Sequence, residues 1–342
     1  MNAASPLNDR TILVTGGTGS FGKAFIRKAL SEHSPRKVIV FSRDELKQWE
    51  MRQADAIFDH DRIRYFLGDV RDRDRLMRAF RDVDLVVHAA ALKQVPAAEY
   101  NPTEFVKTNI HGAMNVVDAA VERRVDRVIA LSTDKAANPI NLYGATKLCS
   151  DKLFVAGNAY VGEAGVPKFS VVRYGNVLGS RGSIVPKWKR MVADGVRELP
   201  VTDERMTRFW ITLDRAAQFV IDNFSRMLGG EIFVPKIPSM KVIDLVTAIA
   251  PDVRPRLIGI RPGEKLHELM ISLDDARFSF EFDSHYAIAP QAVVSTSTVS
   301  CDRLSAIGGR PVADSFEYRS DNNSDWLSVH ALQELVAGID GS

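Results

Sequence analysis

Short apolar runs alternate with amphipathic stretches through the first half of the chain. Runs of about five apolar residues with helical spacing between them are typical of buried parallel strands covered on both faces. The intervening stretches include a predicted helix at Phe21–Leu30 and a polar helix that begins near Asp44. The pattern predicts the doubly wound α/β architecture of a Rossmann domain. The predicted strands are Thr11–Thr15, Lys37–Phe41, Arg62–Leu67, Leu85–His88, Arg127–Leu131 and Phe169–Arg173.

The pattern changes after about Asn176, where proline and glycine become frequent and the elements shorten. We therefore expect a Rossmann domain over 8–175, to which some later segments return, and a smaller substrate-binding lobe over 176–290. Residues 291–342 form a C-terminal extension. Within it, Pro290–Asn323 has little periodicity and is expected to be an ordered loop, followed by a helix near Val329–Val336.

Composition limits the class of protein. The formal net charge is +2 without a long basic run, which argues against nucleic acid as the main partner. Two cysteines, Cys149 and Cys301, are too few for a secreted disulfide scaffold. The sequence shows no apolar signal core and no run of about 20 apolar residues, so we expect a cytoplasmic protein without a membrane span.

A glycine loop follows the first predicted strand. Gly16, Gly19 and Gly22 stand at three-residue spacing between that strand and the first helix. Such a loop lets backbone N–H groups approach a pyrophosphate at the positive end of a helix, so it predicts dinucleotide binding. The residues expected to hold the cofactor here are Gly16, Thr18, Gly19, Ser20, Phe21 and Gly22.

The end of the second strand predicts which dinucleotide is bound. An NAD enzyme usually places a carboxylate there, whereas this chain has Ser42 and Arg43, which suit the 2′-phosphate of NADP. Lys47 lies one helical turn beyond and is expected to assist. In the alternative interpretation Arg43 is a solvated surface residue and Asp44 binds the ribose of NAD. Asp69 and Val70, after the third strand, are expected to flank the adenine.

A candidate catalytic pair follows the fifth strand. Tyr143 and Lys147 are four residues apart in a predicted helix, which places both side chains on one face. An ammonium beside a phenol favours the phenolate, so we expect a lowered tyrosine pKa. Such a tyrosine takes a proton from a sugar hydroxyl while hydride leaves the same carbon.

These features together resemble the extended short-chain dehydrogenase/reductase family. The resemblance extends to the inverting UDP-N-acetylglucosamine 4,6-dehydratases of pseudaminic acid biosynthesis, from about Asn8 to about Ile288. The segments that carry it are GGTGSFG, SRDELKQWEM, GDVRD, HAAALKQVPAAEYNP, STDKAANPINLYGATK, RYGNVLGSRGSIVP, DERMTRFWIT, GGEIFVPKIPSMK and IRPGEKLHE.

The resemblance implies roles for Asp134 and Lys135. Retaining sugar-nucleotide dehydratases are similar but carry Glu where this chain has Lys135. By resemblance Lys135 is the base for the carbon-5 proton, Asp134 is the acid for the departing 6-hydroxyl, and Tyr143 takes the 4-hydroxyl proton. A lysine base must be neutral, so we expect burial, Lys147 and the nicotinamide to depress its pKa; an aspartic acid donor requires a raised pKa. The alternative is a structural turn with a local ion pair.

The resemblance also implies contacts with UDP-N-acetylglucosamine. Lys93 follows the fourth strand near the nicotinamide and the sugar, and Asn176, Arg181 and Arg261 match substrate-contacting positions. Ala89 and Val177 complete the expected cofactor contacts, whereas Lys187, Arg205 and Arg208 are weaker substrate candidates. His88, His111 and His267 lack the spacing of metal ligands, so no metal is expected. Family members assemble from several subunits, which implies a homo-oligomer.

Two other functions remain open. A UDP-sugar 4-epimerase would share the glycine loop and the Tyr143–Lys147 pair, but it needs no acid and base for loss of water, so Asp134 and Lys135 argue against it. A non-catalytic NADP-binding sensor often lacks the tyrosine or the lysine, and both are present here.

Overall fold

A ten-stranded sheet organises the computed structural model of the chain, which describes residues 5–161, 165–291 and 299–339. Its strand order is β16-β14-β15-β10-β6-β5-β4-β1-β2-β3. The strands from β3 to β10 in this order pair in parallel, and β15, β14 and β16 extend the sheet in antiparallel pairing. The predicted doubly wound α/β class is confirmed. The strands are β1 Thr11–Thr15, β2 Lys37–Ser42, β3 Ile63–Leu67, β4 Leu85–His88, β5 Arg127–Thr133, β6 Lys168–Tyr174, β10 Ile232–Pro235, β14 Ser279–Glu281, β15 His285–Ile288 and β16 Arg310–Pro311.

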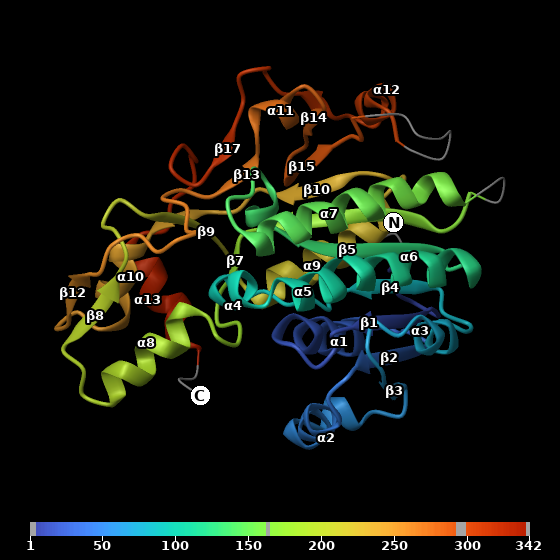
Figure 1. The fold of residues 1–342 in the computed structure, drawn as a ribbon, viewed down its shortest axis with the longest axis horizontal. Helices are drawn as coiled ribbons and strands as arrows, with labels where there is room; N and C mark the ends of the chain where they lie inside the picture. The colour runs from blue at the N-terminus through green and yellow to red at the C-terminus, as the bar shows by residue number, and fades with distance from the viewer. Residues whose placement is uncertain (1–4, 162–164, 292–298, 340–342) are drawn as a thin grey trace.

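Helices cover both faces of this sheet (Figure 1). Helix α1 packs beside α9, and α6 packs between α3 and α7. The connection from β1 to β2 steps toward one end of the strand order, and the connection from β4 to β5 steps toward the other. Because both crossovers are right-handed, α1 and α6 lie on opposite faces of the sheet. The helices around the sheet are α1 Ser20–Glu32, α2 Glu45–Ala54, α3 Arg73–Ala79, α4 Val95–Tyr100, α5 Pro102–Phe105, α6 Gly112–Glu122, α7 Leu142–Gly157, α9 Leu213–Arg226, α11 Leu273–Ala276 and α12 Cys301–Ala306. Short 3₁₀ or π turns occupy η1 Ala56–Asp59, η2 Val106–His111, η3 Asp134–Ala136 and η4 Asn158–Tyr160.

The apolar character of the strands explains the central core. β1 is buried along its whole length, and β4 likewise, as expected for strands covered on both faces. The largest side chains of this core come from the strands and the helices over them, including Phe25, Phe41, Phe154 and Phe169. Every strand of the parallel part therefore presents its carboxyl end to the same edge of a rigid sheet.

A second, smaller core lies beside that edge, at the left of Figure 1. It is built around Trp188, Trp210, Met240 and Leu245, and the C-terminal helix packs on it through Leu332. Its elements are β7 Asn176–Val177, α8 Ile184–Ala193, β8 Glu198–Val201, β9 Thr207–Ile211, β11 Ser239–Lys241, α10 Val242–Ile249, β12 Arg254–Leu257, and α13 Val329–Ala337. The division at 175 and 290 stays a prediction.

The C-terminal tail differs from the expected loop. Helix α12, strand β16 and β17 (Tyr318–Arg319) lie within 290–323; β16 pairs with β14, and β17 pairs with β13 (Leu269–Ile271). These strands have two residues each, too few for periodicity to reveal, and their pairing with distant segments stabilises them. Part of the predicted loop, 292–298, lies outside the described residues. The predicted tail helix near Val329–Val336 is present as α13.

No helix among the described residues has both the length and the apolar character needed to cross a membrane.

Candidate active site

A cavity of about 790 Å³ opens at the carboxyl ends of the parallel strands. It extends from the glycine loop to the start of α7 and on to β7 and the loop after it. Most residues singled out in the sequence line it: Gly16, Thr18, Gly19, Ser20, Phe21, Gly22, Ser42, Arg43, Lys47, Asp69, Val70, Ala89, Lys93, Lys135, Tyr143, Lys147, Asn176, Val177 and Arg181. The structure therefore brings the predicted cofactor and catalytic residues together in one concave site.

The glycine loop packs closely on neighbouring backbone and leaves the start of α1 uncapped. Gly16 has φ +66°, and a Cβ there would lie 2.9 Å from the Cα of Ala90. Gly22 packs so tightly on Gly17 that a Cβ would approach its carbonyl oxygen to 2.5 Å. Helix α1 begins after Gly19 without a side-chain cap, so its first N–H groups are open to an anion. These residues fit a dinucleotide pyrophosphate.

The candidate NADP residues lie at the far end of the same cavity. The Arg43 side chain is 55% exposed and lies 3.7 Å from Asp69 Oδ2, its only ion-pair partner among the described residues. Lys47 pairs with Asp44, which caps α2 by accepting from the Lys47 backbone N–H. Arg43 is therefore available to a phosphate, whereas the Asp44 side chain is engaged at the helix start.

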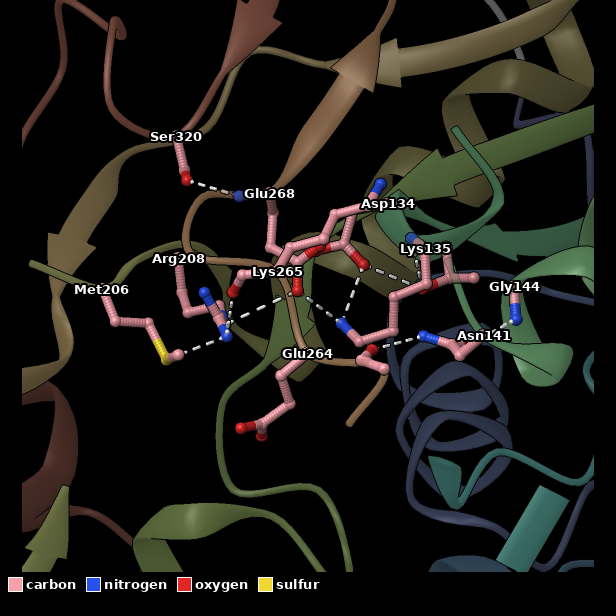
Figure 2. Close-up of polar contacts among 12 residues, drawn as sticks. Asp134, Lys135, Asn141, Gly144, Met206, Arg208, Glu264, Lys265, Glu268 and Ser320 are labelled. Atoms are coloured by element: carbon pink, nitrogen blue, oxygen red, sulfur yellow. Dashed lines mark hydrogen bonds and ion pairs between the residues drawn. The ribbon is translucent and has the colours of Figure 1, made fainter. Parts of the chain in front are cut away.

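The catalytic turn holds Lys135 between two buried carboxylates. Strand β5 ends at Thr133 and continues directly into η3. Lys135 Nζ donates to Asp134 Oδ1 at 3.1 Å and to Glu268 Oε1 at 3.0 Å (Figure 2). Asp134 and Glu268 are 1% and 2% exposed, whereas the Lys135 side chain retains 24% and lines the cavity. Asp134 itself does not line the cavity and lies behind Lys135.

The pKa shifts in this cluster agree with the prediction for Asp134 and contradict the prediction for Lys135. Burial raises the pKa of Asp134, and the charge of Glu268 raises it further, as an acid requires. Burial also pushes the pKa of Lys135 down, but the carboxylates of Asp134 and Glu268 outweigh burial, and the net pKa is raised. The expected depression of the Lys135 pKa is therefore wrong for the protein alone. The cation that opposes the rise is Arg208.

Tyr143 also departs from expectation. Burial raises the pKa of Tyr143 to about 12, and the charge of Lys135 together with a hydrogen bond from Thr133 lowers it only in part. The expected lowering by Lys147 is wrong for the protein alone. Burial has the opposite effect on Lys147: it lowers the Lys147 pKa, and the charge of Asp151 only partly offsets this. Positive charge that enters the cavity would favour the phenolate and lower the pKa of Tyr143.

Residues 263–268 form hydrogen bonds to the turn η3 and to the start of α7. Asn141 caps α7 by accepting from the Gly144 N–H at 2.8 Å, and its amide donates to the Gly263 carbonyl at 2.8 Å. Lys265 Nζ donates to the Ala137 carbonyl at 2.6 Å. Glu268 follows Lys265 by three residues, directly before β13 begins at Leu269. Figure 2 shows Asn141, Lys265 and Glu268 around Lys135.

Glu268 was not predicted as a site residue, whereas Arg261 was expected to contact the substrate. Glu268 stands directly before the apolar run Leu269–Ile271, and a lone carboxylate at the start of a buried strand could have drawn attention to it. Arg261 is mostly exposed, pairs with Glu264, and is absent from the cavity lining. Arg208, a weaker substrate candidate, instead lies 3.5 Å from Glu268 Oε1.

The predicted structural histidines include a well-packed example. His88 Nδ1 lies 2.9 Å from Thr15 Oγ1, and burial lowers the pKa of His88 to about 3. Within the described residues no group of three His, Cys, Asp or Glu side chains could hold a metal ion.

Comparison with known proteins now places the chain in a family. The polysaccharide biosynthesis protein family matches residues 12–290. The chain belongs to this family. It is 55% identical over 336 residues, 98% of this chain and 99% of the relative, to a Campylobacter jejuni protein named UDP-N-acetylglucosamine 4,6-dehydratase (inverting). It is 36% identical, over 97% of this chain and 96% of the relative, to a Rickettsia typhi protein named UDP-glucose 4-epimerase.

Solved structures agree with the fold. Pen from Bacillus thuringiensis superposes with a TM-score of 0.84 at 33% identity, covering 97% of this chain and 98% of that one. DesIV, a dTDP-glucose 4,6-dehydratase from Streptomyces venezuelae solved with NAD, superposes with a TM-score of 0.64 at 25% identity, covering 75% and 86%. The chain has the extended short-chain dehydrogenase/reductase fold of these proteins.

Gly144 supplies a prediction about the turn. A Cβ at this position would lie 2.1 Å from the Lys135 carbonyl oxygen. Alanine usually stabilises a helix interior relative to glycine by roughly 0.5–1 kcal/mol, but overpacking costs about 1–3 kcal/mol. Gly144→Ala should therefore lower the free energy of unfolding measured in urea, and it should lower activity by displacing Lys135.

Gly338→Ala is the matched control, because no atom of the described residues lies within 4 Å of a Cβ there. A Gly144→Ala protein as stable and active as the parent would show that the close approach of α7 to the turn is not needed.

Proposed function

We propose that this chain is a C5-inverting UDP-N-acetylglucosamine 4,6-dehydratase that uses NADP. Its product would be UDP-2-acetamido-2,6-dideoxy-β-L-arabino-hexos-4-ulose, the first intermediate of pseudaminic acid biosynthesis. The observation that carries the proposal is Lys135, which lines the cavity beside Tyr143 and is held against Asp134. The 55% identity to a protein named as an inverting dehydratase supports it over the full chain.

The chain's own residues divide the chemistry among them. The glycine loop, Tyr143 and Lys147 would hold a nicotinamide dinucleotide, which would supply a hydride acceptor for carbon 4, a hydride donor for carbon 6 and, in its oxidised form, a positive charge. Tyr143 takes the proton of the 4-hydroxyl, with Lys147 on the same helix face. The resulting ketone makes the carbon-5 proton acidic. Lys135 removes that proton, and Asp134, whose pKa is raised by burial and by Glu268, protonates the departing 6-hydroxyl.

The added positive charge also bears on Lys135. Its ammonium is favoured in the protein alone because two carboxylates face it. Oxidised nicotinamide would oppose that ammonium only until it accepts hydride, so Arg208 is the cation that still favours the neutral amine when carbon 5 is deprotonated.

The remaining cavity residues are proposed to bind the substrate. Lys93 and Asn176 line the cavity near Lys135 and Tyr143, and Arg181 lies beside the loop after β7, where its backbone N–H donates to Ser20 Oγ. Arg181 suits bidentate contact with a diphosphate. Arg261 would reach the nucleotide only by leaving Glu264, so its role is the least supported of the four.

A UDP-sugar 4-epimerase is the second candidate, because the Rickettsia relative carries that name. An epimerase returns hydride to carbon 4 and loses no water. The buried acid Asp134 and the adjacent Lys135 have no task in that reaction.

We also propose that the enzyme is a cytoplasmic homo-oligomer, as the family resemblance implies. Light scattering of the purified protein would measure the assembly state.

Isotope tracing tests the function. With UDP-N-acetylglucosamine in deuterium oxide, the product should be a 4-keto-6-deoxy sugar that carries solvent deuterium at carbon 5. Deuterium placed at substrate carbon 4 should appear at carbon 6, because the same hydride returns. Recovery of a C4-epimerised sugar without loss of oxygen would favour the epimerase, and tight NADP binding without turnover would favour a sensor.

Lys135→Ala removes the proposed base while leaving the glycine loop and Tyr143 in place. General base catalysis is worth roughly 10²–10⁴-fold, so turnover should fall at least about a hundredfold while cofactor affinity persists. Calorimetric titration of NADP checks that the cofactor site is intact. Turnover within a few fold of the parent would exclude Lys135 as the base.

Tyr143→Phe should abolish oxidation at carbon 4, because only the proton-accepting oxygen is lost and Phe105 and Ala98 still pack on the ring. The measurement is reduced cofactor formed in a single turnover, with NADP affinity as the control. Near-parental oxidation would overturn the assignment of Tyr143.

Arg43→Ala should weaken NADP by about 1.5–3 kcal/mol, the scale of a hydrogen bond to a charged group, and should leave NAD affinity nearly unchanged. Calorimetric titration with both cofactors measures the difference. The exposed Arg62, outside the cavity, provides the control variant Arg62→Ala. Equal affinity of the parent for both cofactors would overturn the NADP assignment in favour of the NAD interpretation.

A further inference from the structure

Glu268 is a buried carboxylate that neither gives nor takes a proton in the proposed chemistry. It precedes β13, and its backbone N–H donates to Ser320 Oγ at 2.9 Å. Its side-chain Oε1 accepts from Lys135 Nζ at 3.0 Å and lies 3.5 Å from Arg208 Nε. Figure 2 shows Glu268 and Asp134 both meeting the amine of Lys135. Glu268 thus comes from a segment 133 residues away from the lysine that it contacts.

Charge balance shows why this second carboxylate matters. A buried ion is costly unless it is paired, and removing one partner leaves the other charge uncompensated. While Asp134 carries a proton, as an acid must, it offers Lys135 Nζ no carboxylate. Glu268 is then the anion that faces Lys135: although burial would raise its pKa, the charges of Lys135 and Arg208 outweigh burial and lower it.

We propose that Glu268 is a positioning residue for Lys135: its carboxylate aims Nζ at the substrate while Asp134 is protonated, and it shares the ammonium with the Asp134 carboxylate once Lys135 has taken the carbon-5 proton. This proposal rests on the proposed dehydratase function.

The elimination step balances with Glu268 ionised throughout. The neutral amine of Lys135 takes the carbon-5 proton and becomes ammonium. The electron pair of that bond forms the double bond between carbons 5 and 6. The carbon-6 to oxygen bond breaks, and the oxygen leaves as water with the proton of Asp134. Asp134 ends as a carboxylate and Lys135 as an ammonium, so the total charge of the cluster does not change.

Other charged groups also act on Lys135, and the test must separate them from Glu268. Asp134 precedes it on the same turn, Arg208 lies on β9, and Lys265 reaches the turn through Ala137. Lys93, after β4, and Tyr143, on α7, face it across the cavity. Only Glu268 and Asp134 raise the Lys135 pKa among the causes resolved for it. Replacing Glu268 while keeping Asp134 therefore isolates one carboxylate.

Glu268→Gln tests the proposal, because it keeps the shape and removes the charge. Loss of the carboxylate lowers the Lys135 pKa, so the acid-side limb of the kcat/KM against pH profile should move to lower pH. Because the base is then weaker and less well aimed, kcat should fall about tenfold or more, yet by less than the ~10²–10⁴-fold expected for loss of the base. KM should change little, and Glu268→Asp, which keeps the charge, should keep the limb near its parental position.

The control is Glu231→Gln, which removes a buried carboxylate that accepts from Ser170 Oγ at 2.6 Å and lies outside the cavity. Its pH profile should match the parent. A lowered kcat in Glu268→Gln with an unmoved limb would show a merely structural role and overturn the proposal.

A second measurement does not depend on turnover. Lysines dimethylated with ¹³C-formaldehyde can be titrated by NMR in the free protein, with the Lys135 signal assigned from its absence in Lys135→Arg. It should titrate above an ordinary lysine in the parent and at lower pH in Glu268→Gln. A Lys135 signal that titrates like an ordinary lysine in the parent overturns the proposal even if Glu268→Gln fails to fold. If the titration is as expected but no 4-keto product forms, the proposed function is wrong, while the effect of Glu268 on the Lys135 pKa is confirmed.

Discussion

The ion pairs of Lys135 with Asp134 and Glu268, and of Arg208 with Glu268, join three distant parts of the chain. The turn η3 after β5 supplies Asp134 and Lys135, the segment before β13 supplies Glu268, and β9 supplies Arg208. Charges buried this deeply persist only when each is paired, because desolvation costs several kcal/mol per ion. The small lobe and the sheet must therefore meet in one arrangement, and that arrangement fixes where Lys135 enters the cavity.

The cofactor half of the cavity depends on a different constraint, close approach of backbone to backbone. Gly16 and Gly22 leave no space for a Cβ, so the loop lies against Ala90 and against its own first glycines. The open end of α1 and the catalytic turn then face the same cavity because β1 and β5 end at one edge of the sheet. Binding and chemistry are thus placed by sheet topology, while the ion pairs set the protonation of the reacting groups.

Local pattern was sufficient for much of this. β1 and β4 were predicted with their observed ends, because buried parallel strands are continuous apolar runs. The glycine loop and the pair Tyr143 and Lys147 were readable because each is a short motif within one element. Glu268 was not, since its partner is 133 residues away and only the tertiary fold brings them together. The predicted lowering of the Lys135 pKa was wrong for the same reason, because it considered burial and nearby cations without the carboxylate of Glu268. Strands β16 and β17 escaped notice because two residues carry no period. Arg261 was expected at the substrate but pairs with Glu264 outside the cavity lining, because a family match does not fix where an exposed side chain points.

The central claim is that a lysine base at this position yields inversion, and the configuration of the first product tests it most directly. The measurement is NMR of carbon 5 in the 4-keto-6-deoxy sugar at the earliest sampled times, before the proton beside the ketone exchanges with solvent. The account predicts the L-arabino configuration. A D-xylo product at those times would contradict it and identify a retaining dehydratase instead.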